Sequence, residues 1–309
     1  MTLRLLRPVL PGPNPEASFW DECPPFEVHE PGELAVPLVF SSPHSGRHYP
    51  IDFIESSRLA LERLRRSEDA FVEELFAGVT RLGAPLLAAR YPRAFLDLNR
   101  EPFELDPDLF EDALPAFANT RSLRVQGGLG TIARVVGEAE EIYRRRLTVA
   151  EALSRIERLY WPYHSQLSSL IERTRRCFGL AVLIDCHSMP SGDANSSGPG
   201  SRAHFVLGDR FGSACAPELT RYVEAVLKGM GYDVALNRPY AGGYITEHYG
   251  APAQGVHALQ LEINRALFTD ESRLTLTDGF LPLRSQLMQL VAGMADFART
   301  LQPMRAAAE

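Results

Sequence analysis

The segment LAVLIDCHS, residues 180–188, gives the clearest indication of the fold class. Its apolar residues follow one another without the alternation of a half-exposed strand, which predicts a central strand covered on both faces. The run then passes into Asp185, Cys186 and His187, followed by a loop of small residues that ends at residue 202. We therefore expect a buried strand that carries reactive side chains to its carboxyl end.

Comparable apolar runs and helical patterns alternate along the rest of the chain. Strands alternating with helices predict an α/β fold, a single domain of three layers (α/β/α) around a mixed, mostly parallel sheet. Residues 1–35 are rich in proline and acidic groups and are expected to form an irregular N-terminal arm. The other predicted strands are 34–40, 85–90, 94–98, 204–209, 233–236 and 256–263, and the predicted helices are 56–82, 148–176 (kinked at Pro162), 216–231 and 276–301.

Two segments fit this alternation poorly. Residues 101–147 mix proline, glycine and charge with weak periodicity, as a lid or binding loop does. The segment GGYITEHYG (242–250) is expected to be a loop, either a mobile wall over a substrate or an ordinary glycine turn.

Bulk composition excludes several classes of protein. The 309 residues carry a net charge of -7, which argues against a general nucleic-acid binder. The four cysteines form no CxxC pair, as in a reducing compartment. The N-terminal apolar run is broken by proline too early for a secretory signal, and no run approaches the roughly 18 residues of a membrane span. We expect a cytoplasmic protein that binds neither nucleic acid nor membranes.

Four of the apolar runs end in residues that bind metals or transfer protons. Ligands of open α/β sheets bind beyond the carboxyl ends of the strands. Two imidazoles and several carboxylates converging there are what a zinc site requires, and one carboxylate can be a general base. The residues are His44, the group Asp97, Asn99 and Arg100, the pair Asp185 and His187, and Glu262.

Each of these residues also has a structural interpretation. A single histidine after a strand is more often a hydrogen-bonded loop residue than a ligand, and Asp97 can cap a turn or pair with Arg100. Glu262 lies in an apolar strand, where a carboxylate is costly without a strong partner. Arg93 or Arg265 can be that partner. Together, however, the residues favour a metal or acid–base site.

Six motifs in the sequence resemble the N-formylglutamate amidohydrolase family. They occur in family order over residues 37–270, and GGYIT followed by LEINRAL is the most specific part. The family is similar in architecture to the zinc carboxypeptidases and aspartoacylases. The resemblance therefore implies a zinc-carboxypeptidase-like (phosphorylase/hydrolase-like) fold, a catalytic domain over residues 36–303 and one catalytic zinc ion. The motifs are PHSGRHYP, SEDAFVEELF, RAFLDLNREP, DCHSMP, PYAGGYITEHYG and ALQLEINRALF.

The resemblance also implies roles for individual residues. His44 and His187 are implied zinc ligands, and Glu262 is the implied general base. The carboxypeptidases have a second ligand in an HxxE motif, but here that position is Arg47, which stays protonated and cannot bind zinc. Asp69 is the expected third ligand, with Glu68 as the alternative. Both can also simply lie on an exposed helix surface.

The implied reaction is zinc-dependent hydrolysis of a small acidic N-acyl amino acid, N-formyl-L-glutamate to L-glutamate and formate. Arg93, or else Arg134, is expected to stabilise the oxyanion. Asp185 is expected either to orient the His187 imidazole or to be a structural carboxylate. The expected substrate contacts are Asn99, Arg100, Arg134, Tyr244 and Thr246.

Two other functions compete with this one. The first is a zinc carboxypeptidase or amidase that acts on another N-acyl amino acid or a peptide. The second is a binding protein that retains the fold without zinc or catalysis. The sequence does not choose among them, nor does it determine the oligomeric state, the metal used in the cell or the role in histidine degradation that the resemblance implies.

Overall fold

The computed structural model describes residues 23–137, 139–192 and 203–301, which form two compact units. Unit 1 contains the described residues of Met1–Phe26, Gly46–Glu68 and Ala89–Ser168. Unit 2 contains those of Glu27–Ser45, Asp69–Ala88 and Ser169–Glu309. Each unit is described by itself.

Unit 2 is built on a seven-stranded mixed sheet in the order β1-β3-β2-β6-β9-β7-β8. β2, β3, β6 and β9 run parallel, and β7 is antiparallel to β9. The α/β prediction with a mixed sheet is confirmed, and residues 181–189 form a central strand as predicted. The strands are β1 (Phe26–His29), β2 (Leu38–Ser42), β3 (Leu86–Ala89), β6 (Ala181–Met189), β7 (Phe205–Gly208), β8 (Val234–Leu236) and β9 (Val256–Asn264).

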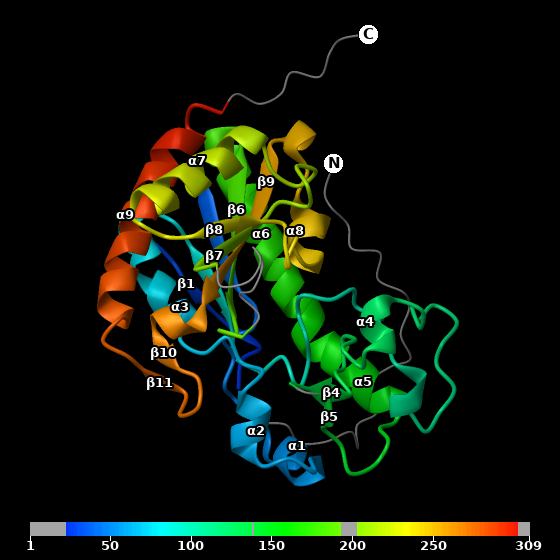
Figure 1. Ribbon diagram of the computed structural model, residues 1–309. Coiled ribbons are helices and arrows are strands. Elements are labelled where there is room, and N and C mark those ends of the chain that lie inside the picture. The colour runs from blue at the N-terminus through cyan, green and yellow to red at the C-terminus, as the bar shows by residue number, and fades with distance from the viewer. Residues whose placement is uncertain (1–22, 138, 193–202, 302–309) are drawn as a thin grey trace. The chain divides into compact units, whose positions relative to one another are not determined.

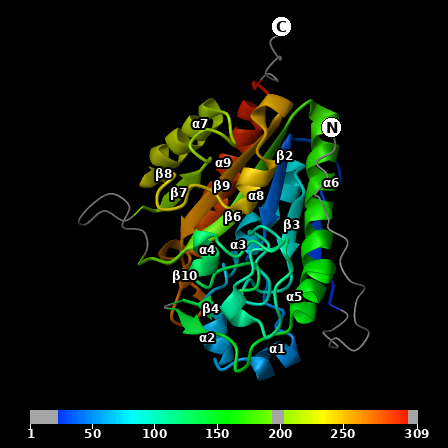
Figure 2. The ribbon, with the colours of Figure 1, turned by 90° about the vertical axis from the view of Figure 1, so that its right-hand side faces the viewer.

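The two faces of this sheet carry different side chains. Because side chains alternate along a strand, Cys186 and Leu261 enter the apolar core, while Asp185 and His187 lie on the opposite face. Three helices contribute to that core: α3 (Val72–Phe76), α7 (Pro217–Gly229) and α9 (Phe280–Ala298). A fourth helix, α8 (Tyr244–Tyr249), packs against β6 and β9. Figure 1 shows α3 and α9 on one side of the strands and α8 on the other, and Figure 2 shows α8 nearer the viewer, with α9 behind. The polar face therefore lies beneath α8.

The helices of unit 2 follow the sequence pattern where that pattern is long. Helices predicted at residues 216–231 and 276–301 are confirmed with shorter ends, because their apolar residues recur at helical spacing. The elements are α3 (Val72–Phe76), a 3-10 helix (Ala77–Leu82), α7 (Pro217–Gly229), α8 (Tyr244–Tyr249), 3-10 turns (Pro252–Gln254 and Arg265–Leu267), a small hairpin of β10 (Thr269–Asp270) and β11 (Thr275–Leu276), and α9 (Phe280–Ala298).

Unit 1 consists mainly of short elements joined by turns. The weak periodicity of residues 101–147 is matched by brief helices and two-residue strands. Thr148 and Glu151 form a capping box at the start of α5, and Pro162 lies at the second position of α6, after a π-helical segment. The elements are α1 (Ile51–Ser56), α2 (Leu61–Arg65), a 3-10 turn (Pro107–Leu109), α4 (Leu123–Gln126), β4 (Val135–Val136), β5 (Glu140–Glu141), α5 (Val149–Arg155), a π-helix (Ile156–Tyr160) and α6 (Trp161–Phe178), whose last residues belong to unit 2.

Three predicted elements are wrong. Residues 94–98 form turns instead of a strand, since the Phe95 and Leu96 N–H groups donate to the Pro92 carbonyl oxygen. The predicted helix 56–82 is interrupted before α3, where Phe71 adopts a left-handed φ of 68°. The expected loop at 242–250 contains the helix α8.

The described residues contain no helix with the length and apolar character needed to cross a membrane. Residues 26–29 of the expected N-terminal arm form β1, whereas residues 1–22 lie outside the described part of the chain.

Candidate metal centre

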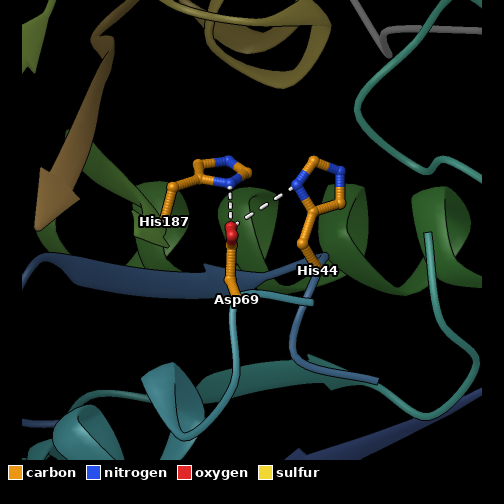
Figure 3. Close-up of side chains that lie close together, drawn as sticks. All are labelled: His44, Asp69 and His187. Atoms are coloured by element: carbon orange, nitrogen blue, oxygen red, sulfur yellow. Dashed lines mark hydrogen bonds and ion pairs between the residues drawn. The ribbon is translucent and has the colours of Figure 1, made fainter. Parts of the chain in front are cut away.

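Two imidazoles and one carboxylate of unit 2 converge in the interior. The candidate ligand atoms of His44, Asp69 and His187 all lie within 4.8 Å of one another, and all three side chains are buried. His44 follows β2, Asp69 precedes α3, and His187 belongs to β6. Figure 3 shows the two rings turned towards the same carboxylate. The structure thus brings together the residues expected to bind a metal.

A single carboxylate oxygen faces both rings. Asp69 Oδ2 lies 3.0 Å from His187 Nδ1 and 3.6 Å from His44 Nδ1. Two imidazole nitrogens and one carboxylate oxygen within 4.8 Å of one another are a donor set that zinc and related divalent cations favour. The donor chemistry of the buried cluster therefore fits a divalent cation.

Other residues hold the second oxygen of Asp69. Asp69 Oδ1 accepts hydrogen bonds from Arg265 Nη2 (3.0 Å) and Ser188 Oγ (3.3 Å). Burial raises the pKa of Asp69, but the hydrogen bonds with His187 and His44 outweigh it, and the pKa lies well below the usual aspartate range. Asp69 is therefore ionised, with Oδ2 directed at the imidazoles.

The break before α3 explains how Asp69 reaches this position. The Asp69 N–H donates to the His44 carbonyl oxygen over 3.0 Å, which ties the segment to the end of β2. The left-handed conformation of Phe71 then starts α3 in a new direction. A continuous helix would have satisfied the Asp69 N–H within the helix instead.

His187 also has a carboxylate partner behind the ring. Its Nε2 lies 3.0 Å from Asp185 Oδ2, and Asp185 is two residues earlier on the same face of β6. Burial lowers the pKa of His187, but the charge and hydrogen bond of Asp185, the hydrogen bond of Asp69 and the charge of Glu262 outweigh it and hold the pKa well above the usual histidine range. Asp185 is thus placed to orient the imidazole with Nδ1 towards Asp69.

Glu262 lies beside His187 on the neighbouring strand. The two are register partners in the parallel pair β6–β9, so their side chains share one face of the sheet. Gln260 Nε2 donates to Glu262 Oε1 over 2.8 Å, and Gln260 Oε1 accepts from the Gly243 N–H over 2.6 Å. The sequence interpretation missed Gln260. A polar residue two positions before Glu262, within an apolar run, is the signal that identifies it.

The alternative third ligand, Glu68, has partners within unit 1. Its side chain is only 1% exposed, Tyr49 Oη donates to its Oε1 over 2.8 Å, and Arg65 Nε does so over 3.0 Å. Arg65 Nη2 also donates to Glu68 Oε2 over 3.3 Å, so both oxygens of this carboxylate have structural partners within unit 1. Asp69 is the carboxylate beside the two imidazoles.

Asp97 organises three of the predicted site residues in unit 1. Arg93 Nη2 donates to Asp97 Oδ2 over 2.8 Å, and the Asn99 N–H donates to Asp97 Oδ1 over 2.9 Å. Arg100 Nη2 lies 3.6 Å from Asp97 Oδ2. The turn-capping interpretation of Asp97 is confirmed, and this local pairing is what replaces the predicted strand.

Arg100 and Arg134 are each held by other groups of unit 1. Arg100 Nε donates to the Leu129 carbonyl oxygen over 2.9 Å, and burial lowers the pKa of Arg100 to about 10, so the guanidinium stays protonated at neutral pH. Arg134 Nε donates to Asp106 Oδ2 over 2.7 Å. Arg134 thus pairs with a different carboxylate from the Asp97 group.

Tyr244 and Thr246 both lie on α8. The Tyr244 ring stacks on His248 with 4.9 Å between centroids, and Thr246 is fully buried. Gly242 adopts a φ of 116°, which favours glycine, and Gly243 provides the N-cap of the helix. Gly242 is therefore the glycine that the entry into α8 requires.

Several known proteins are similar to this chain over most of its length. A family model described as N-formylglutamate amidohydrolase matches residues 36–269. An N-formylglutamate deformylase from Pseudomonas putida is 31% identical over 240 residues, covering 77% of this chain and 83% of the relative. The crystal structure of N-formylglutamate amidohydrolase from Ralstonia eutropha JMP134 superimposes with a TM-score of 0.85 at 39% identity, covering 90% of this chain and 99% of that one. A gene product of Agrobacterium tumefaciens shares the fold (TM-score 0.62, 18% identity, 89% and 94% covered).

Proposed function

The chain belongs to the N-formylglutamate amidohydrolase family, and on that premise we propose that it hydrolyses N-formyl-L-glutamate to L-glutamate and formate. The observation that carries the proposal is the buried cluster of His44, Asp69 and His187 with Glu262 beside it on the next strand. We place the catalytic domain at residues 36–303.

His44, Asp69 and His187 are the residues that would hold a zinc ion. The proposal is supported by their donor set and by Asp185, which backs the His187 ring as carboxylates commonly do for metal-binding histidines. When bound, zinc supplies Lewis acidity, which lowers the pKa of water and polarises a carbonyl oxygen. Arg265 and Ser188 keep Asp69 Oδ2 turned inward by binding its other oxygen.

Glu262 is the proposed general base. Its carboxylate takes a proton from water as the water oxygen bonds to the formyl carbon, and it returns the proton to the amine nitrogen as the C–N bond breaks. Formate and the free amino acid are then the products, and Glu262 is again ionised. Its place on β9, in register with His187, supports this role.

We propose the substrate-contacting roles from the family motifs. Asn99 and Arg100 are proposed to bind a substrate carboxylate, which arginine recognises through two parallel hydrogen bonds. Arg93, or else Arg134, is proposed to stabilise the oxyanion. Tyr244 and Thr246 on α8 are proposed to contact the substrate.

The proposal also includes a cytoplasmic location and, from the family resemblance, a role in histidine degradation. The free state of all four cysteines supports a reducing compartment.

One experiment tests the reaction against its rivals. Purified protein is analysed for bound metal and then assayed on a panel of N-formyl, N-acetyl and N-formimino amino acids and peptides. We expect one zinc per chain and the highest kcat/KM on N-formyl-L-glutamate. A preference for another acyl group or a peptide would support the broader amidase or carboxypeptidase, and a chain without zinc or turnover would support the non-catalytic binding protein.

A further inference from the structure

Gln260 is a buried amide that is hydrogen-bonded at both ends. The residue is 4% exposed, its Oε1 accepts from the Gly243 N–H over 2.6 Å, and its Nε2 donates to Glu262 Oε1 over 2.8 Å. A backbone N–H can only donate, and an ionised carboxylate can only accept. The side chain between them must therefore accept at one end and donate at the other, which glutamine does and which glutamate, leucine or methionine does not.

The register of the sheet gives this contact a counterpart. Gln260 pairs with Asp185 and Glu262 pairs with His187 in the parallel ladder of β6 and β9. Asp185 supports the His187 ring from two residues earlier on β6, and Gln260 supports Glu262 from two residues earlier on β9. His187 and Glu262, the proposed ligand and base, thus share one register position of the sheet. Their hydrogen-bond partners, Asp185 and Gln260, share the register position two residues earlier.

We propose that Gln260 is a positioning residue for the reaction, acting through Glu262, an inference that rests on the proposed role of Glu262 as the base. The terminal torsion of a glutamate side chain is broad, so an unsupported carboxylate samples many orientations. A buried hydrogen bond from Nε2 fixes the plane of that carboxylate. Proton transfer requires such a fixed geometry, because a misplacement of about 1 Å can cost about 100-fold in rate.

The other end of Gln260 links the base to α8. Gly243 is the N-cap of this helix, and Tyr244 and Thr246 follow it. The Gln260 amide therefore connects α8, which is proposed to contact the substrate, with the Glu262 carboxylate, which is proposed to move the proton. Because Gln260 donates to the carboxylate that is proposed to move the proton, its loss should lower kcat more than it changes KM.

The test is a double-mutant cycle on the zinc-loaded full-length chain. Gln260→Met removes both hydrogen bonds, whereas Gln260→Glu keeps the acceptor for the Gly243 N–H and replaces the donor to Glu262 with a second carboxylate oxygen. We expect either change to lower kcat on N-formyl-L-glutamate by about 10–100-fold, with KM within about 3-fold of wild type and zinc content unchanged. In a Glu262→Gln background, the same changes should lower kcat by less than about 2-fold, since residues that act as a unit are not additive.

His257→Gln is the matched control. His257 is a buried polar residue of the same strand on the opposite face, and its Nδ1 accepts from the Ala216 N–H over 3.2 Å. This variant should keep kcat within about 2-fold of wild type, even if its thermal stability falls.

Two results would overturn the positioning role. One is an unchanged kcat in both Gln260 variants, and the other is an equal fold loss with and without Glu262, which a purely structural residue would produce. A zinc-loaded wild-type chain that is inactive on every substrate of the panel would instead refute the proposed function. The three outcomes are distinct.

Discussion

His187 and Glu262 occupy the same register position on the neighbouring parallel strands β6 and β9. Neighbouring strands lie roughly 4.8 Å apart, so the backbone ladder itself sets the separation of a proposed ligand and a proposed base. Asp69 completes the cluster from outside the sheet, before α3. The following predictions test what each of these residues does.

Adjacent carboxylates should differ in their effect on metal content. Asp69→Asn should deplete bound zinc because Asp69 Oδ2 faces both imidazoles, whereas Glu68→Gln should retain it. His44→Ala and His187→Ala should also deplete zinc. Elemental analysis of the purified variants gives the zinc-to-protein ratio. Full zinc occupancy in any of the three depleted variants would remove that residue from the proposed ligand set.

Glu262→Gln should separate catalysis from metal binding. The amide keeps the shape of the side chain but cannot take a proton, so kcat should fall by about 10²–10⁴-fold while zinc stays bound. Steady-state assays and metal analysis on the same preparation measure both quantities. Near-normal turnover would exclude Glu262 as the base.

The affinity for zinc should rise with pH. Asp185 and its neighbours raise the pKa of His187, so the metal-free ring carries a proton at neutral pH that zinc must displace. The raised pKa of His187 also stabilises the metal-free folded chain. This contribution to the free energy of unfolding is fully present below about pH 6.5, the usual pKa of histidine, and it is lost as the pH rises through the pKa that His187 has in the folded chain. Competition with a chelator between pH 6 and 9 measures the affinity.

Asp185→Asn should weaken zinc binding and flatten this pH dependence. The variant removes the Asp185 charge, which is the largest cause that raises the pKa of His187, and it weakens the hydrogen bond that orients the His187 ring. The affinity for zinc should therefore fall by about 10–100-fold. An affinity and a pH slope equal to those of wild type would show that Asp185 is a structural carboxylate only.

Arg100→Lys and Arg93→Lys should affect substrates differently. Lysine cannot form the two parallel hydrogen bonds of arginine to a carboxylate, so Arg100→Lys should reduce kcat/KM on acidic N-formyl amino acids far more than on neutral ones. Arg93→Lys, at the proposed oxyanion position, should reduce both to a similar degree. An equal loss on both substrate classes in Arg100→Lys would contradict the carboxylate role of Arg100.

Arg155 should be important for the stability of unit 1. Its guanidinium lies 4.0 Å from the Phe95 ring centroid and donates to Tyr143 Oη over 2.7 Å. Arg155→Met should lower the free energy of unfolding by about 2–4 kcal/mol, because a buried cation–π contact and charged hydrogen bonds are lost. Urea denaturation measures the free energy of unfolding. The control is Arg158→Met at an exposed position, whose free energy of unfolding should lie within about 0.5 kcal/mol of wild type.

Sequence patterns alone correctly predicted the α/β class, the central strand at 180–185, the strand at 256–263 and the helices near residues 216–231 and 276–301. Continuous apolar runs and helical periodicity are local signals, and local patterns are enough to identify elements that are long and buried. The same patterns placed His44, His187 and Glu262 at or near strand ends, where ligands bind in such sheets.

Other features of the site depend on contacts between residues far apart in the chain. Whether Asp69 or Glu68 faces the imidazoles depends on a left-handed residue at Phe71 and on a hydrogen bond to the distant His44 carbonyl oxygen. The position of Gln260 between the Gly243 N–H and the Glu262 carboxylate became visible only in the folded chain. Strand register and the path of a broken helix are set by contacts between residues far apart in the chain, and a local sequence pattern carries no information about them.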